Sequence, residues 1–215
     1  MVDQPDVRTS GRTLLQTTES ADADAASGAV RNRSNVAVRH GPSVPVVDTP
    51  VLFEVELPAD ESDCRCEWTF GDGSTATGEK ASRIYDAAGE TEVTLTVARD
   101  DGETETVRES VTIYREVGVE LRESETEDGL MPVVLRGDGD LDPATAVAVE
   151  SLRFGAPTAL AMGSGAAPVR TETREGDLCV WVREDRTGLG DGDATPRLAG
   201  RTVDGRPLAG TADGA

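Results

Sequence analysis

Hydrophobic and polar residues alternate along the middle of this chain with a period of two. The runs in which this period is clear are 51–57, 66–70, 93–97 and 107–113. In the first run Val51, Phe53 and Val55 share one side of an extended backbone, while Glu54 and Glu56 occupy the other side. This pattern predicts half-buried β-strands, each with one face toward a core and one face toward water.

Turn residues separate the alternating runs at intervals of roughly 8 to 12 residues, which is typical of an antiparallel sandwich. The pair Asp101-Gly102 stands between the third and fourth runs and predicts a tight β-hairpin. No part of this region has the 3.6-residue period of an amphipathic helix. We therefore expect residues 42–114 to form an all-β domain.

The second half of the chain, residues 116–215, continues the strand pattern with different sequences. Short apolar runs at 131–135 and 178–182 predict two buried strands. The segment 198–210 predicts another hairpin, which would turn at Asp204-Gly205. These features predict a second β-sandwich-like domain after the first.

The first 41 residues have a different composition, rich in small polar residues and without any aromatic residue. Such a segment has too little apolar surface to offset the entropy lost on ordering, so residues 1–41 are predicted to be a disordered leader. The start of the chain also lacks the basic residues and apolar core of a secretion signal, which leaves a cytoplasmic location open.

Charge limits the classes of partner. The chain has 41 Asp and Glu against 21 Lys and Arg, a formal charge of −20. Nucleic acid and anionic membrane surfaces would repel such a chain, so we expect neither as a partner. No apolar run of about 18 residues occurs, so no membrane insertion is expected. His40 is the single histidine, which removes most catalytic and zinc chemistry that needs imidazole.

Three features of residues 42–114 occur in a recognisable order. They are Trp68-Thr69-Phe70-Gly71-Asp72-Gly73, then Tyr85 four residues before Gly89, then the alternating run 93–97. In these features the segment resembles the PKD (polycystic kidney disease) domain, an immunoglobulin-like β-sandwich. The resemblance implies a place outside the cell, in a cell-surface or exported protein.

The residues of this motif suggest structural roles. Trp68 is expected to be the large inward anchor between the two sheets. Asp72 can accept amide hydrogens to close the turn, and Gly71 and Gly73 permit backbone angles that a Cβ would oppose. Tyr85 is placed like a tyrosine corner, with its hydroxyl bonded back to the chain.

Two further resemblances concern the second half and the surface. Residues 147–169 and 177–210 resemble a poorly characterised β-rich domain that recurs at the C-terminal side of secreted and surface proteins of prokaryotes. That domain has no established activity. The acidic surface, with Lys80 as the only lysine, resembles proteins of salt-loving archaea.

Asp138, Asp140 and Asp142 have the alternate spacing with which a calcium-binding loop begins. An EF-hand would then require Gly and Glu where this chain has Pro143 and Val149, so that motif is ruled out. The sequence leaves two interpretations, a looser calcium site lined by oxygen atoms and an acidic turn after the strand at 131–135.

Trp181 is the one aromatic residue out of phase with its apolar neighbours. If Leu178, Val180 and Val182 face the core, then Trp181 and Cys179 face the other way. An outward tryptophan is a candidate stacking platform for a sugar ring or a contact for a neighbouring domain. Burial between two sheets or under a loop is the structural alternative.

No catalytic fingerprint of the GxSxG, HExxH, P-loop or dinucleotide type occurs, so we expect neither an enzyme nor a cofactor other than calcium. The predicted function is a non-catalytic binding or spacer module of a cell-surface or exported protein, with a protein or glycan as partner. Two alternatives stay open: accessory domains detached from an extracellular hydrolase, and a calcium-responsive cytoplasmic scaffold.

The charge pattern predicts that stability rises with salt. At an ionic strength of about 1 M the screening length falls to about 3 Å, so the carboxylates no longer repel one another over the whole surface. Thermal unfolding followed by circular dichroism should give a higher midpoint in KCl at about 1 M than at about 0.1 M. Equal midpoints at the two concentrations would contradict the prediction.

Overall fold

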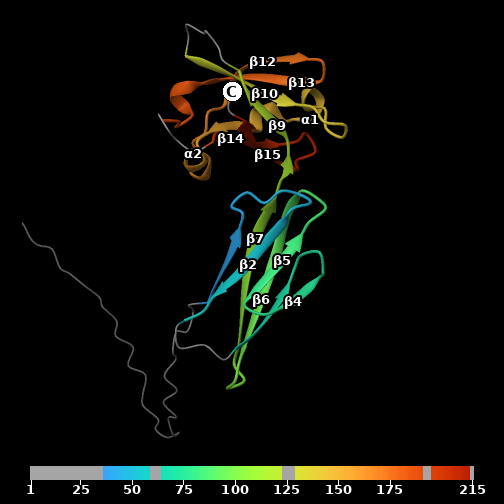
Figure 1. Ribbon diagram of the computed structural model, residues 1–215, viewed down its shortest axis with the longest axis vertical. Coiled ribbons are helices and arrows are strands. Elements are labelled where there is room, and N and C mark those ends of the chain that lie inside the picture. The colour runs from blue at the N-terminus through green and yellow to red at the C-terminus, as the bar shows by residue number, and fades with distance from the viewer. Residues whose placement is uncertain (1–35, 59–63, 123–128, 191–194, 214–215) are drawn as a thin grey trace, which may run out of the picture. The chain divides into compact units, whose positions relative to one another are not determined.

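The computed structural model describes residues 36–58, 64–122, 129–190 and 195–213. These residues fold mainly as β-strands (Figure 1). Their apolar side chains form two separate cores. The predicted all-β class is confirmed. Most of the predicted leader, residues 1–35, lies outside the described residues.

Residues 36–114 form an immunoglobulin-like β-sandwich of two antiparallel sheets. One sheet has the strand order β1-β2-β5 and the other β4-β3-β6-β7. The strands are β1 (Ala37–Gly41), β2 (Pro50–Glu56), β3 (Cys64–Thr69), β4 (Thr75–Thr77), β5 (Lys80–Ile84), β6 (Gly89–Arg99) and β7 (Thr104–Ile113).

The alternating runs become the strands that face the first core. Val51, Phe53 and Val55 of β2 are buried, and the residues between them are exposed. Trp68 of β3 is wholly buried, its ring lies 6.0 Å from that of Phe53, and its indole nitrogen donates to the carbonyl oxygen of Gly78 at 2.8 Å. The indole therefore bridges the two sheets, as its position in the sequence predicts.

The turn after Trp68 has the predicted construction. Asp72 accepts a hydrogen bond at 2.9 Å from the amide of Ser74, and Gly73 has a φ of +84°. Gly71 serves a different purpose from the one expected, because a Cβ at this position would lie 2.1 Å from Oγ1 of Thr91. Gly71 is thus required by close approach of the chain to β6 rather than by an unusual φ.

Tyr85 differs from its prediction. Its ring is buried in the core, but its hydroxyl has no hydrogen-bond partner among the described residues, so the predicted bond of a tyrosine corner is wrong. Burial, followed by the nearby charge of Asp72, raises the pKa of the hydroxyl to about 12. Tyr85 contributes through the packing of its ring.

The sandwich begins earlier than predicted. Strand β1 pairs with β2 in the register Val38 with Val55 and His40 with Phe53, although residues 37–41 were expected to belong to the leader. Val36, Val38 and His40 are partly buried and alternate with exposed residues. This alternation is short and interrupted by polar residues, so it is a weak signal beside the entropy argument for the leader.

The described residues of the second lobe, 115–122, 129–190 and 195–213, form the remaining strands and four short helical turns. The strands are β8 (Arg115–Glu116), β9 (Gly118–Leu121), β10 (Leu130–Arg136), β11 (Arg153–Gly155), β12 (Pro168–Arg174), β13 (Asp177–Arg183), β14 (Arg197–Arg201) and β15 (Pro207–Asp213). The helices are α1 (Pro143–Ala146) and α2 (Pro157–Ala161), with 3-10 turns η1 (Val149–Ser151) and η2 (Glu184–Arg186).

Strand β15 joins the two halves of this lobe. The strand order is β11-β14-β15-β9-β10-β13-β12, and β8 pairs with β15 in parallel, as β9 does farther along the same strand. Leu198 and Leu208 of one half and Val133 and Val180 of the other belong to one buried cluster. The lobe is therefore sandwich-like, and the hairpin predicted at Asp204-Gly205 connects β14 to β15.

The short helices were not predicted, because a single turn shows no periodicity. Helix α1 nevertheless has a recognisable start. Asp142 is its N-cap, accepting a hydrogen bond at 3.0 Å from the amide of Ala144, and Pro143 is the first helical residue. An acidic cap followed by proline is a known signal for a helix start.

Chain continuity connects the sandwich to the second lobe at Tyr114. This residue pairs with Val46 of the sandwich, and the next residue, Arg115, already pairs with Leu208 of β15. Both backbone groups of Tyr114 are bonded to the sandwich, because its amide donates to the carbonyl oxygen of Pro45 at 2.8 Å and its carbonyl oxygen accepts from the amide of Val47 at 2.9 Å. No spacer residue separates the two lobes.

The role of Trp68 predicts a large loss of stability on truncation. Trp68→Ala should lower the free energy of unfolding by about 3–5 kcal/mol, because it removes a fully buried ring and its hydrogen bond. Urea unfolding at constant high salt measures the change. Leu52→Ala is the control, since Leu52 is 61% exposed on the same sandwich and should change stability by less than about 0.5 kcal/mol. Similar losses for both variants would contradict the bridging role.

Candidate binding sites

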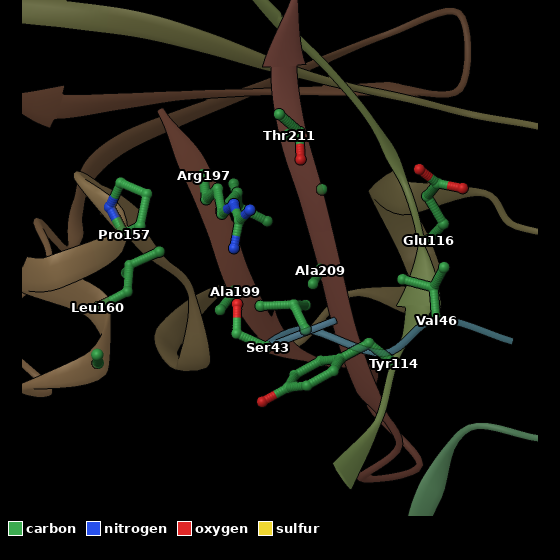
Figure 2. Close-up of a pocket in the computed structure, with 14 residues that line it drawn as sticks. Ser43, Val46, Tyr114, Glu116, Pro157, Leu160, Arg197, Ala199, Ala209 and Thr211 are labelled. Atoms are coloured by element: carbon green, nitrogen blue, oxygen red, sulfur yellow. The ribbon is translucent and has the colours of Figure 1, made fainter. Parts of the chain in front are cut away.

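A hollow of about 360 Å³, which we call the groove, opens where Tyr114 meets β14 and β15 (Figure 2). Its floor is the outward face of the two strands, where Ala199 pairs with Ala209. These two small side chains leave the space that larger ones would fill. Leu160 of α2 lines one side, and Val46 lines the opposite side.

Four polar side chains surround the groove without using their hydrogen-bonding groups inside the protein. They are Arg197, Ser43, Tyr114 and Thr211. Within the part of the chain that the structure describes, none of these four side chains makes a hydrogen bond or ion pair. Arg197 is half-buried, and Glu116, the one carboxylate of the lining, is exposed. The groove therefore offers one guanidinium and three hydroxyls to a ligand.

A second hollow of about 240 Å³ adjoins the groove. The two hollows share Tyr114, Leu160 and Ala199 in their linings. The second hollow extends toward Arg153 and Arg201. Both of these guanidinium groups bind backbone carbonyl oxygens, Arg153 that of Leu152 at 2.7 Å and Arg201 that of Gly205 at 3.0 Å. An elongated ligand could occupy both hollows.

Trp181 lies on the outward face of β13. Leu178, Val180 and Val182 are buried in the second core, whereas Cys179 and Trp181 are only partly buried on the other face. The guanidinium carbon of Arg170 lies 4.4 Å from the centre of the Trp181 ring, which is the geometry of a cation–π contact. One face of the ring is therefore in contact with arginine, and a binding role for Trp181 stays a prediction.

Ion pairs flank Trp181 on the same face of the sheet. Glu172 of β12 accepts a hydrogen bond from Arg174 at 2.8 Å. On the other side, Arg136 binds both Glu120 and Asp177. A hydrogen bond from the amide of Gly137, together with Arg136, lowers the pKa of Asp177. This face combines a partly exposed indole with charged groups that already satisfy one another.

Two of the three candidate calcium ligands, Asp138 and Asp142, have separate structural uses, whereas the Asp140 side chain is exposed. Oδ1 of Asp138 accepts from the amides of Asp140 and Leu141, and its carboxylate pairs with Arg115 at 3.0 Å. Asp142 caps helix α1. Among the described residues, no three His, Cys, Asp or Glu side chains gather closely enough to hold a metal ion. Calcium binding at this turn stays a prediction, which calorimetric titration in concentrated KCl would test.

The three cysteines are free thiols. The sulfur atoms of Cys64 and Cys66 lie 4.0 Å apart on β3, and Cys66 is buried as its phase with Trp68 predicts. Burial, followed by the neighbouring Cys64, raises the pKa of Cys66 to about 11. Cys66 is therefore a protonated core side chain at neutral pH.

Sequence reasoning did not predict the groove. Its lining comes from four separate parts of the chain, around residues 43–46, 114–116, 157–161 and 197–211. None of these parts carries a motif, and an unpaired Arg197 looks like any other arginine in the sequence. The only local signal was the run of small residues around Ala199, which indicates a strand with little side-chain volume.

A comparison with protein families supports the nature of the sandwich. Residues 33–114 match the family described as "PKD domain". This confirms the resemblance seen in the sequence, and the match begins before Pro42, as the structure does. No curated protein matches the chain. The resemblances of the second lobe and of the acidic surface stay predictions.

Solved structures with a similar course of the chain have low sequence identity. They include the Bacteroides ovatus mixed-linkage glucan utilization locus protein SGBP-B in complex with a mixed-linkage heptasaccharide, at 12% identity and a TM-score of 0.30 over 83% of this chain. This chain spans 48% of that protein. Fibronectin(III)-like modules of Clostridium thermocellum CbhA match at 11% identity, with a TM-score of 0.32 over 82% of this chain and 93% of theirs. A segment of two fibronectin type III domains from chicken tenascin matches at 14% identity, with a TM-score of 0.31 over 81% and 96%.

The described helices are all too short or too polar to span a lipid bilayer.

The contacts of Asp138 predict a pH-dependent contribution to stability. Hydrogen bonds from the amide of Asp140 and then Leu141, with Arg115 nearby, lower the pKa of this carboxyl below its ordinary 3.8. A lowered pKa means that the folded state favours the ionised form, so the contribution is present above pH 3.8 and is lost as the pH falls below that value. Asp138→Asn should cost about 0.5 kcal/mol at neutral pH, the scale of an exposed ion pair.

Urea unfolding of both proteins at neutral pH and at about pH 2.5 measures this difference. The two midpoints should differ at neutral pH and converge in acid. Asp140→Asn is the matched control, because the Asp140 carboxylate is exposed and makes none of these contacts. A difference between wild type and Asp138→Asn that persists in acid would show that the loss comes from the altered turn rather than from charge.

Proposed function

We propose that this chain is a non-catalytic binding module of a cell-surface or exported protein, and that its partner is a protein or a glycan of the cell envelope. The observation that carries this proposal is the groove, a hollow of about 360 Å³ whose surrounding polar side chains have no partners among the described residues. Polar groups in a concave site are normally satisfied by water or by a ligand, and a few of them suffice to orient a ligand.

The motif residues of the sandwich support a scaffolding role for the first lobe. Trp68 and Tyr85 are buried, and the carboxylate of Asp72 is used to close a turn and to bind Arg83. Each of these residues stabilises the sandwich, and none lines the groove. The sandwich would thus hold one wall of the groove in place, while the surface at Tyr114 makes the contact with the partner.

The match to the PKD domain family supports the expected location, because such domains generally occur outside the cell membrane. The acidic surface fits the same proposal in a salt-rich medium, where screening over about 3 Å would let a chain of charge −20 approach an anionic envelope.

Binding to the cell envelope tests this function. Fluorescently labelled protein should bind saturably to envelope preparations from the source organism. Ala199→Leu should weaken this binding at least about tenfold, because the added side chain would occupy the floor shared by the two hollows. Treating the envelope with periodate or with protease before the assay distinguishes a glycan partner from a protein partner.

Thr173→Leu is the matched control, since it adds the same side chain at an exposed position of β12. The control should bind as the wild type does, and both variants should keep the wild-type circular-dichroism spectrum. Trp181→Ala separates the two candidate surfaces. If Trp181→Ala abolishes binding and Ala199→Leu does not, the contact surface is the outward face of β13 and the groove is not the site.

A further inference from the structure

Arg197 differs from Arg201 and Arg206, the arginines that follow it along the chain. Arg201 pairs with Glu90 at 3.4 Å, and Arg206 pairs with Asp204 at 3.0 Å. Arg197 is half-buried in the groove and makes no ion pair with any described residue. In a chain with about twice as many acidic as basic residues, a partly buried guanidinium without a carboxylate is unexpected.

We propose that the groove binds a uronate residue of an acidic polysaccharide, with the guanidinium of Arg197 holding the sugar carboxylate. This inference rests on the proposed binding function and names the class of ligand.

The guanidinium provides the charge recognition. Arginine offers a planar fork of N–H donors that matches both oxygen atoms of a carboxylate, and partial burial shields such a contact from solvent. Glu116, the one carboxylate that lines the groove, is exposed and does not pair with Arg197. The position opposite the guanidinium is therefore open to an external carboxylate.

The overall charge of −20 does not prevent this contact. At 0.15 M salt the screening length is about 8 Å, and at about 1 M it is about 3 Å. Repulsion from carboxylates elsewhere on the surface is thus largely screened, whereas a direct hydrogen-bonded contact is much shorter than these lengths. The direct contact between the Arg197 guanidinium and the ligand carboxylate therefore outweighs the screened repulsion from the rest of the surface.

The rest of the groove fits a sugar better than an apolar body. Ser43, Tyr114 and Thr211 each bring a hydroxyl without a partner among the described residues, with Thr211 toward one end of the hollow and Ser43 and Tyr114 toward the other (Figure 2). Sugar hydroxyls are both donors and acceptors, as these side chains are. Ala199 and Ala209 form a flat, small floor on which the C–H face of a sugar ring can lie.

The size and openness of the site favour a residue within a polymer. A volume of about 360 Å³ is at the lower end of the range of about 300–1,000 Å³ for small-molecule sites. The adjoining hollow of about 240 Å³, with Arg153 and Arg201 in its lining, continues past Tyr114. A chain with a carboxylate on successive residues would meet arginine in both hollows.

Isothermal titration calorimetry with defined oligosaccharides tests the proposal. The probes are oligomers of galacturonate, glucuronate and mannuronate, each compared with its methyl ester, which has the same ring without the charge. The wild type should bind at least one acidic oligomer, and its ester should bind at least about tenfold more weakly. Arg197→Gln should weaken binding of the acid at least about tenfold and leave the weak binding of the ester unchanged.

Arg183→Gln is the matched control. Arg183 is exposed at the end of β13, does not line the groove, and also makes no ion pair with a described residue. The Arg183→Gln variant should bind the acidic oligomer as tightly as the wild type does. Tyr114→Phe provides a second variant, which removes one hydroxyl and keeps the ring, and it should weaken binding of the acid about threefold to tenfold. Unfolding midpoints equal to that of the wild type show that each variant is folded.

Three results would overturn the proposal. One is equal affinity of the acid and its methyl ester. A second is the same affinity for Arg197→Gln and Arg183→Gln. A third is that an acidic peptide, titrated as a separate probe, binds while none of the uronate oligomers does. If the labelled protein still binds the envelope when no uronate is bound, the ligand class is wrong and the binding function stands. If envelope binding is absent as well, both proposals fail.

Discussion

The direct passage of the backbone from one sheet into the next is the constraint on which the candidate site depends. Tyr114 is held by Val46 in the sandwich, and Arg115 immediately pairs with Leu208 in the second lobe. No spacer intervenes, and Ser43 and Val46 of the sandwich line the groove together with Ala209 of β15. The small residues at Ala199 and Ala209 then determine that this contact leaves a hollow. A flexible linker at Tyr114 would have removed one wall of the groove.

Oppositely charged side chains also pair across neighbouring strands on the exposed faces of the sheets. Glu54 of β2 stands opposite Lys80 of β5 in the register of the sheet, and the two groups are 2.8 Å apart. Arg39 of β1 stands opposite Glu54 in the register but forms its ion pair with the diagonal neighbour Glu56 at 2.6 Å. Each such exposed pair contributes little to the free energy of unfolding, because water screens the attraction. Their value lies in register, because a slip by one residue would place these charges in the core and the valines in water.

The sequence predicted those features that depend on neighbouring positions. A period of two is visible within a single strand, so β2, β3, β6 and β7 could be recognised, and so could the hairpins at Asp101-Gly102 and Asp204-Gly205. The burial of Trp68 and Cys66 followed from the same phase. The outward position of Trp181 did too, because it requires only that its three apolar neighbours face the core.

Features that depend on contacts between distant parts of the chain could not be predicted from the sequence. The hydroxyl of Tyr85 is buried without a hydrogen-bond partner among the described residues, which the position of this residue before a strand did not reveal. The unpaired state of Arg197 depends on which carboxylates the topology brings near it, and the groove combines segments more than 150 residues apart in the chain. Asp138 and Asp142 had the spacing of metal ligands, but the formation of a turn and of a helix cap engages these carboxylates with backbone amides.

The position of β15 has a consequence for the order of events during synthesis. This strand is the last of the described strands along the chain, yet it lies in the interior of its sheet, between β14 and β9. Both halves of the second core are therefore incomplete until residues 207–213 have left the ribosome, whereas all the strands of the sandwich precede Tyr114. The sandwich can fold co-translationally while the lobe that follows it must wait with its apolar faces uncovered, which makes that lobe the natural point for chaperone engagement.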